Sequence, residues 1–179
     1  MTRLLTVGHG NATQEDFTNL LRDAGVTRIV DVRRFPGSRR HPQFGSEPMA
    51  AWLAEAGLDY RWEERLGGRR RLDPDDPEAD PWWQVQAFRA YAAHTRSAEF
   101  IDALTELLAS LDDEGDTAVM CSESLWWRCH RRLVSDVAVL LHGVEVLHLA
   151  HSGRLAEHPV AAGARVAPDG LRYDVAGDG

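Results

Sequence analysis

The stretch TRIVDVRR, residues 27–34, indicates the architecture of this chain. Residues 27–32 are apolar and β-branched enough for a strand that is buried on both faces, as strands of a parallel sheet are. At the end of this run the sequence becomes charged, with Asp31, Arg33 and Arg34 close together. The pattern predicts a buried strand that brings polar side chains to one edge of a sheet.

Apolar runs of this kind alternate with helical periodicity along the rest of the chain. The expected strands are 4–7, 27–32, 58–62, 117–120 and 144–149, with a weaker one at 171–175, and the expected helices are 17–24, 49–56, 83–94, 98–111 and 125–142. Such alternation predicts a single α/β domain with a central, mainly parallel sheet and helices on both faces. Ligands of such sheets bind beyond the carboxyl ends of the strands. We expect residues 1–151 to form this domain and 152–179 to be a loosely held C-terminal extension of it.

Length and composition narrow the class of protein. A chain of 179 residues can bury one core without metals or disulfides. The start does not resemble a signal peptide, and no apolar run approaches the ~20 residues of a membrane span, so we expect a cytoplasmic protein that does not bind membranes. The net charge of −8 disfavours general adhesion to nucleic acid.

The basic residues are unevenly placed. All 20 are Arg, and 13 of them lie in the three stretches 28–40, 61–71 and 128–132. An acidic protein with clustered Arg predicts one confined site for a small anionic ligand, because the guanidinium fork binds two oxygens of a phosphate or carboxylate.

The segment CSESLWWRCHRR, residues 121–132, carries the densest chemistry in the sequence. It leads from a predicted strand into a predicted helix, and the free N–H groups and dipole of a helix start favour anions. We therefore expect Arg128 and Arg131 to bind an anion, with Glu123 beside them, and His130 to be a candidate for moving a proton.

The same segment holds both thiols, Cys121 and Cys129. A helix start and nearby guanidiniums lower a thiol pKa, so Cys121 is the better candidate nucleophile. The alternative is that both thiols are buried for packing. A phosphatase-like Cys-x5-Arg loop would need Arg where the chain has Trp127. Eight residues of continuous helix would separate the sulfurs by about 12 Å, which excludes a redox pair unless the loop folds back.

A metal site is disfavoured. Cys121, Cys129, His130 and His9 offer zinc-type ligands, but neighbouring residues of a helix point about 100° apart, which suits one tetrahedral ion poorly. We expect no metal and no other cofactor.

Three further positions complete the candidate site. Asp31 either orients Arg33 or acts as a base, and Arg39 is a further candidate for anion binding; the alternative is a purely structural ion pair. The dipeptide Gly67–Gly68 permits close approach of backbone to a ligand, although a plain turn explains it equally well. His9 ends the first strand, where an imidazole of ordinary pKa suits proton transfer at neutral pH.

With these residues in place, the sequence from Leu5 to Leu149 resembles the bacterial and archaeal family known only as domain of unknown function 488. The resemblance rests on spaced motifs, which are Thr6–His9; Asp31-Val32-Arg33 with Pro36, Ser38 and Arg39; Phe44; Leu66-Gly67-Gly68; Phe88; Tyr91-Ala92; Cys121 with Glu123; and Cys129-His130-Arg131. The chain departs from the family pattern at Gly10, where Ser is usual, and at Trp126, where Pro is usual. The resemblance supports the fold and the choice of site residues and implies no particular reaction.

Three classes of function fit these observations. The first is an enzyme that acts on a small phosphorylated, nucleotide-like or carboxylate substrate, the second a nucleic-acid-binding module, and the third a non-catalytic protein that binds a ligand or partner. Nucleic-acid binding needs Arg residues spread over a face, whereas an enzyme needs them to converge in a cleft with titratable neighbours. The sequence defines no oligomeric state.

Overall fold

The computed structural model describes residues 2–37 and 39–176. Within these residues the chain forms a six-stranded sheet of order β3-β2-β4-β1-β5-β6. Its strands are β1 (Arg3–Gly8), β2 (Val26–Asp31), β3 (Asp59–Trp62), β4 (Asp116–Cys121), β5 (Glu145–Leu149) and β6 (Leu155–Glu157). The first five run parallel, and β6 pairs antiparallel with β5. The predicted α/β fold with a mainly parallel sheet is confirmed.

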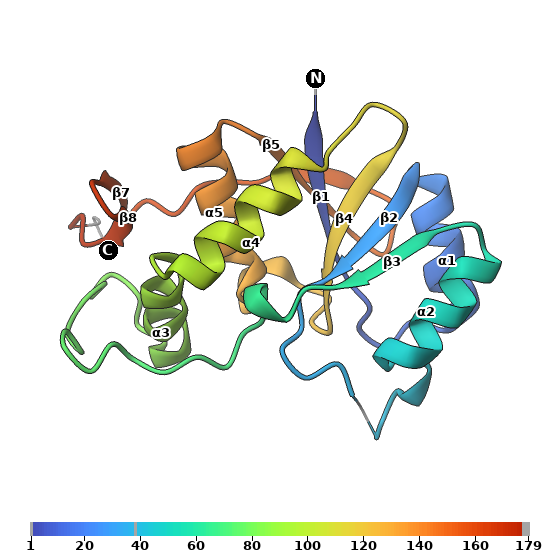
Figure 1. Ribbon diagram of the computed structural model, residues 1–179, viewed down its shortest axis with the longest axis horizontal. Helices are drawn as coiled ribbons and strands as arrows, with labels where there is room; N and C mark the ends of the chain where they lie inside the picture. The colour runs from blue at the N-terminus through green and yellow to red at the C-terminus, as the bar shows by residue number, and fades with distance from the viewer. Residues whose placement is uncertain (1, 38, 177–179) are drawn as a thin grey trace.

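Helices cover both faces of the sheet (Figure 1). They are α1 (Gln14–Asp23), α2 (Ser46–Glu55), α3 (Gln86–Thr95), α4 (Ala98–Ala109) and α5 (Arg131–His142). Alternate strand residues point to opposite faces. Leu5 therefore packs with Phe17 and Trp52 on the α1–α2 side, whereas its neighbour Leu4 packs with Phe100 and Leu133 on the α3–α5 side.

One predicted helix boundary is wrong. The helix expected over 125–142 begins only at Arg131, because Trp126–Arg128 forms a short 3₁₀ helix and Cys129 is extended, with φ −135° and ψ 172°. The apolar spacing through Leu125 and Cys129 is helical, but the backbone turns back toward the end of β4 before α5 begins. The other helices start or end within three residues of expectation; α3, for example, begins at Gln86 rather than 83.

The chain after β5 is more firmly held than expected. β6 extends the sheet, and β7 (Ala164–Ala167) pairs with β8 (Gly170–Tyr173) in a separate hairpin. Tyr173 is fully buried, and its hydroxyl donates to Asp136 of α5 over 2.9 Å. Of the predicted extension 152–179, residues 177–179 lie outside the described residues, as does Ser38 of the family motif. The boundary at residue 151 stays a prediction.

No helix in the described part of the chain is long and apolar enough to cross a membrane.

Candidate functional site

Three neighbouring strands end at one edge of the sheet. β4 lies between β2 and β1, with Asp31 opposite Met120 and Gly8 opposite Cys121. The backbone N–H of His9 donates to the Cys121 carbonyl over 3.0 Å, which joins the first residue beyond β1 to the end of β4. The loops that follow these strands leave the same lower edge in Figure 1. The strand-end argument therefore brings His9, Asp31 and Cys121 together.

A pocket of about 590 Å³ opens at this edge. Its lining residues are His9, Gly10, Asn11, Arg33, Arg34, Phe35, Gly37, Arg40, His41, Gly68, Arg69, Cys121, Ser122, Glu123, Ser124, Cys129 and His130. Among these described residues there are four guanidiniums and one carboxylate, that of Glu123. The pocket is therefore cationic in a protein whose net charge is −8.

Asp31 fixes Arg33 at the floor of the pocket. The carboxylate is fully buried and accepts from Arg33 Nε over 2.8 Å, from Arg33 Nη2 over 2.7 Å and from the Tyr60 hydroxyl over 2.6 Å. Burial lowers the pKa of Arg33, but the Asp31 contacts outweigh it and raise the pKa above its usual value. Nη2 also donates to the Phe44 carbonyl, whereas Nη1 points toward His9 Nε2 at 3.4 Å. Asp31 thus orients its partner, and one amino group of Arg33 remains near the pocket.

His9 is more buried than a strand-end position implies. It is 2% exposed, and its ring stacks on Phe44 with centroids 4.2 Å apart. Burial, helped by the charge of Arg33, lowers its pKa to about 4, against the raising effect of a hydrogen bond to the Gly10 carbonyl. The expectation of an ordinary imidazole pKa is wrong for this reason. At neutral pH His9 Nδ1 donates to Gly10 over 2.9 Å, which leaves Nε2 as an acceptor on the Arg33 side.

The two thiols meet at the opposite wall. Because the loop after β4 folds back, Cys121 Sγ and Cys129 Sγ lie 3.2 Å apart rather than at the distance expected of a continuous helix. Arg131 Nε donates to both sulfurs, over 3.0 Å to Cys121 and 3.2 Å to Cys129. Both cysteines line the pocket, but Cys121 is 2% exposed, whereas Cys129 is only partly buried and does not pack in the core.

Their environments push the two thiol pKa values apart. Burial, together with the hydrogen bond and charge of Cys129, raises the pKa of Cys121 well above its usual value. Burial also raises the pKa of Cys129, but the hydrogen bond from Cys121 and the charge of Arg131 outweigh it, and the net pKa is lowered. Of the two thiols, Cys129 is therefore the one whose surroundings favour the thiolate.

Arg131 does not reach the pocket as predicted. It is 1% exposed, and besides the sulfurs it donates to the Glu123 carbonyl over 2.6 Å and to Thr6 Oγ1 over 3.0 Å. Its geometry assigns it to the thiol pair rather than to an external anion.

Behind Arg131 a buried chain of hydrogen bonds runs to α5. Thr6 Oγ1 contacts His148 Nδ1 at 2.6 Å, His148 Nε2 contacts His158 Nδ1 at 2.8 Å, and His158 Nε2 contacts Asp136 at 2.7 Å. Because the Asp136 carboxylate accepts, His158 donates to it through Nε2 and accepts at Nδ1 from His148 Nε2, which leaves His148 Nδ1 to accept from the Thr6 hydroxyl. Burial lowers the pKa of His148 to about 3, so this ring is neutral. The chain links Arg131 to the buried carboxyl group of Asp136.

His130 and Gly68 form the wall beside the thiols. His130 Nε2 donates to the Val32 carbonyl over 2.8 Å, which leaves Nδ1 facing Gly68, where an added Cβ would lie 3.1 Å away. Burial lowers the pKa of His130. Gly67 approaches the backbone of Arg34 rather than a ligand, since a Cβ there would lie 2.5 Å from Arg34 N.

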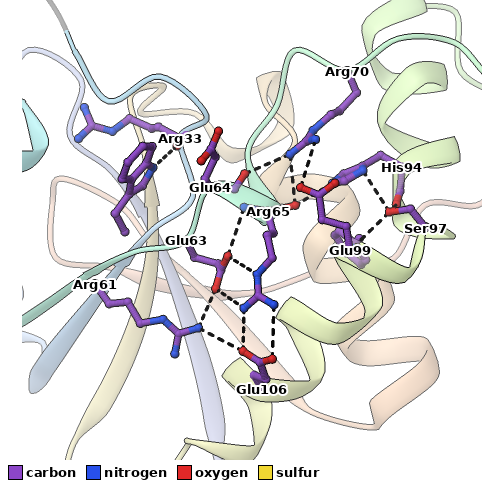
Figure 2. Close-up of polar contacts among 12 residues, drawn as sticks. Arg33, Arg61, Glu63, Glu64, Arg65, Arg70, His94, Ser97, Glu99 and Glu106 are labelled. Atoms are coloured by element: carbon purple, nitrogen blue, oxygen red, sulfur yellow. Dashed lines mark hydrogen bonds and ion pairs between the residues drawn. The ribbon is translucent and has the colours of Figure 1, made fainter.

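An ion-pair network holds the segment that carries these glycines (Figure 2). Glu63 accepts from Arg61 over 2.7 Å and from Arg65 over 2.8 Å, and Arg65 reaches on to Glu106 of α4 over 2.7 Å. Arg70 turns back to donate to the Gly67 carbonyl over 3.0 Å. The segment that forms this wall is therefore connected to α4 by the Arg65–Glu106 ion pair.

Two further predicted residues, besides those described above, lie outside the pocket. Arg39 and Arg128 are exposed and do not line it. Glu123 does line it, and its Oε1 accepts from the Leu125 N–H over 3.1 Å.

Several lining residues escaped the sequence reasoning. They include Arg34, Arg40, Arg69, Asn11 and His41. The guanidiniums of Arg34 and Arg69 lie 5.4 and 5.7 Å from the Phe35 ring centre, so they flank one exposed aromatic at the rim. For Arg34, Arg40 and Arg69, the clustering of Arg along the sequence was the signal that could have placed them in the site.

Within the described residues no group of three or more His, Cys, Asp or Glu side chains is arranged to hold a metal ion.

The fold and site define an α/β protein with a thiol pair in an arginine-lined pocket. A family model described as domain of unknown function DUF488 matches residues 13–138, and the chain belongs to this family. No curated protein and no solved structure matched the chain. The matched range includes both thiols and Arg131, whereas His9 and the His148–His158 end of the buried chain lie beyond it.

Proposed function

We propose that this protein is a thiol-dependent enzyme that binds a small anionic substrate in the pocket and attacks it with the Cys129 thiolate. The single observation that carries the proposal is the convergence of four guanidiniums and a partly exposed, low-pKa thiol on one pocket with one carboxylate. Perturbed thiols in electropositive, accessible sites are typical of reactive cysteines.

The groups around the pocket support distinct roles. Arg34, Arg40 and Arg69 hold the anion at the rim, and Arg33 Nη1 holds it at the floor. His9 is neutral at pH 7 and can accept a proton at Nε2. Cys121, the thiol favoured by sequence, lies deeper and is suited to support Cys129.

The placement of charge favours a small ligand over nucleic acid. A volume of about 590 Å³ fits a metabolite-sized molecule. Arg34 and Arg69 line one pocket and flank the Phe35 ring, and Arg70 donates to the Gly67 carbonyl. Polyanion binding would require the opposite arrangement.

The test compares iodoacetate with neutral iodoacetamide as alkylating agents, each normalised to free cysteine. We expect Cys129 to react with iodoacetate about tenfold faster than the normalised iodoacetamide rate at low salt, because the pocket concentrates anions. Arg34→Gln should reduce this preference, and inorganic phosphate should protect against both agents. Arg22→Gln is the matched control, because Arg22 is exposed in the last turn of α1, at the opposite edge of the sheet.

Equal normalised rates for the two agents contradict anion recognition. Phosphate binding by calorimetry together with an unreactive Cys129 contradicts the enzyme and leaves a non-catalytic ligand-binding protein.

A further inference from the structure

Two free thiols in contact at a ligand pocket can do more than one nucleophile can. The sulfurs of Cys121 and Cys129 are 3.2 Å apart and share the Arg131 Nε–H. Closing this gap by about 1.2 Å would reach the length of a disulfide bond. Cys121 ends β4, whereas Cys129 lies on the irregular loop ahead of α5, so the loop can supply the movement.

We infer that Cys121 and Cys129 are a redox-active dithiol–disulfide couple, that the substrate is a small disulfide bearing carboxylate groups, and that an external dithiol reduces the protein disulfide after each exchange. The inference rests on the proposed anion pocket for its choice of substrate. The formation of a disulfide between the two thiols depends only on the contact between their sulfurs and not on the anion pocket.

Exposure assigns the two roles. Both cysteines line the pocket, but Cys129 is only partly buried, so it is the thiol that a soluble disulfide can reach. Cys121 is 2% exposed, and its sulfur contacts Cys129, Arg131 and the Glu123 carbonyl. A buried thiol in contact with the attacking one is placed to resolve a mixed disulfide and is protected from external reagents.

The reaction balances in two exchanges. The Cys129 thiolate attacks one sulfur of R–S–S–R, the S–S bond breaks, and the first thiolate RS⁻ leaves. The Cys121 sulfur then attacks Cys129 Sγ, the Cys129–SR bond breaks, and the second RS⁻ leaves and takes up the Cys121 proton. The net change is protein dithiol, with one thiol ionised, plus R–S–S–R to protein disulfide plus RSH and RS⁻.

Arg131 explains how the charge passes between the thiols. While Cys129 is a thiolate, its charge and hydrogen bond help burial to raise the pKa of Cys121. The mixed disulfide removes that charge, and Arg131 Nε, already 3.0 Å from Cys121, then has one anionic sulfur to stabilise. The same guanidinium thus activates the attacking thiol first and the resolving thiol second. The hydrogen-bond chain to Asp136 keeps Arg131 in place through both steps.

The experiment mixes the reduced full chain with oxidised glutathione, which is anionic, or cystamine, which is cationic. Rates are normalised to a free dithiol and followed by intact mass and peptide mapping. We expect a Cys121–Cys129 disulfide, seen as the loss of two hydrogens, to form about tenfold faster with oxidised glutathione than with cystamine at low salt. Cys121→Ser should stop at a glutathione adduct on residue 129, and Cys129→Ser should form no adduct. Because the wild-type mass change is sufficient by itself, poor folding of either variant does not remove the test.

The outcomes separate the two proposals. A glutathione adduct that persists on wild-type Cys129 overturns the dithiol couple and leaves the anion pocket intact. An internal disulfide that forms at equal normalised rates with both reagents overturns the carboxylate-bearing substrate together with the anion pocket. No reaction with either reagent overturns the couple and the reactive thiol alike.

Discussion

Replacing Glu63 by Gln should weaken both the fold and the wall of the pocket. Glu63 is buried between Arg61 and Arg65, and burial, which raises its pKa, is outweighed by hydrogen bonds from Arg65 and Arg61 that lower it from 4.5 to about 2 (Figure 2). That difference corresponds to about 3 kcal/mol in favour of the folded state. Because the two guanidiniums are 41% and 35% exposed, solvent screens them, and we expect about half, ~1.5 kcal/mol.

The pH dependence follows from the direction of this shift. A carboxylate with a lowered folded pKa stabilises the protein fully above 4.5, and this contribution is lost as the pH falls toward 2. Urea unfolding followed by tryptophan fluorescence should therefore give a cost for Glu63→Gln at pH 7 that falls to roughly half by pH 3. Glu64→Gln is the matched control, because the backbone carbonyl of Glu64, rather than its carboxylate, accepts from Arg70. Equal costs for the two variants, or a cost independent of pH, would refute the reasoning.

Three further predictions test the site. His9 should titrate near pH 4 by NMR. Because its folded pKa lies below 6.5, the wild-type protein should lose stability relative to His9→Gln as the pH falls from 6.5 to 4. An NMR midpoint near 6.5 would contradict this prediction. Gly67→Ala should destabilise by about 1–3 kcal/mol in thermal or urea unfolding, because its Cβ would overlap Arg34, whereas Gly37→Ala, with open space, should be near neutral; equal effects refute the clash. ¹⁵N shifts should place the proton of His148 on Nε2 from pH 5 to 9, and a proton on Nδ1 would contradict the direction of the buried chain.

The sheet is predictable from the sequence because its central strands are continuous apolar runs that end in polar residues. In β2, for example, the strand pattern of the sequence continues without interruption up to Asp31. β6 and β7 are short and largely exposed, so they leave no hydrophobic period to detect. Their positions depend on pairing with β5 and β8, which local sequence does not encode.

The site is predictable as a set of strand ends but not as a set of contacts. His9, Asp31 and Cys121 follow from the topology alone. The role of Arg131 does not, because the helical spacing of Cys129 and Leu133 conceals the extended backbone that brings the two thiols together. Once the loop folds back, a guanidinium expected to bind an anion becomes a buried partner of sulfur.

The buried carboxylate of Asp136 has a consequence for the order in which the protein is completed during synthesis. It accepts from His158 Nε2, the Ala161 N–H and the Tyr173 hydroxyl, all of which follow it in the chain. On the ribosome, β1 to β5 and α5 have emerged before any of these three donors does. A carboxylate docked at that stage would be buried without hydrogen bonds, which costs several kcal/mol. We therefore expect the final docking of α5, and with it the placement of Arg131 against the thiols, to follow the emergence of the segment through Tyr173.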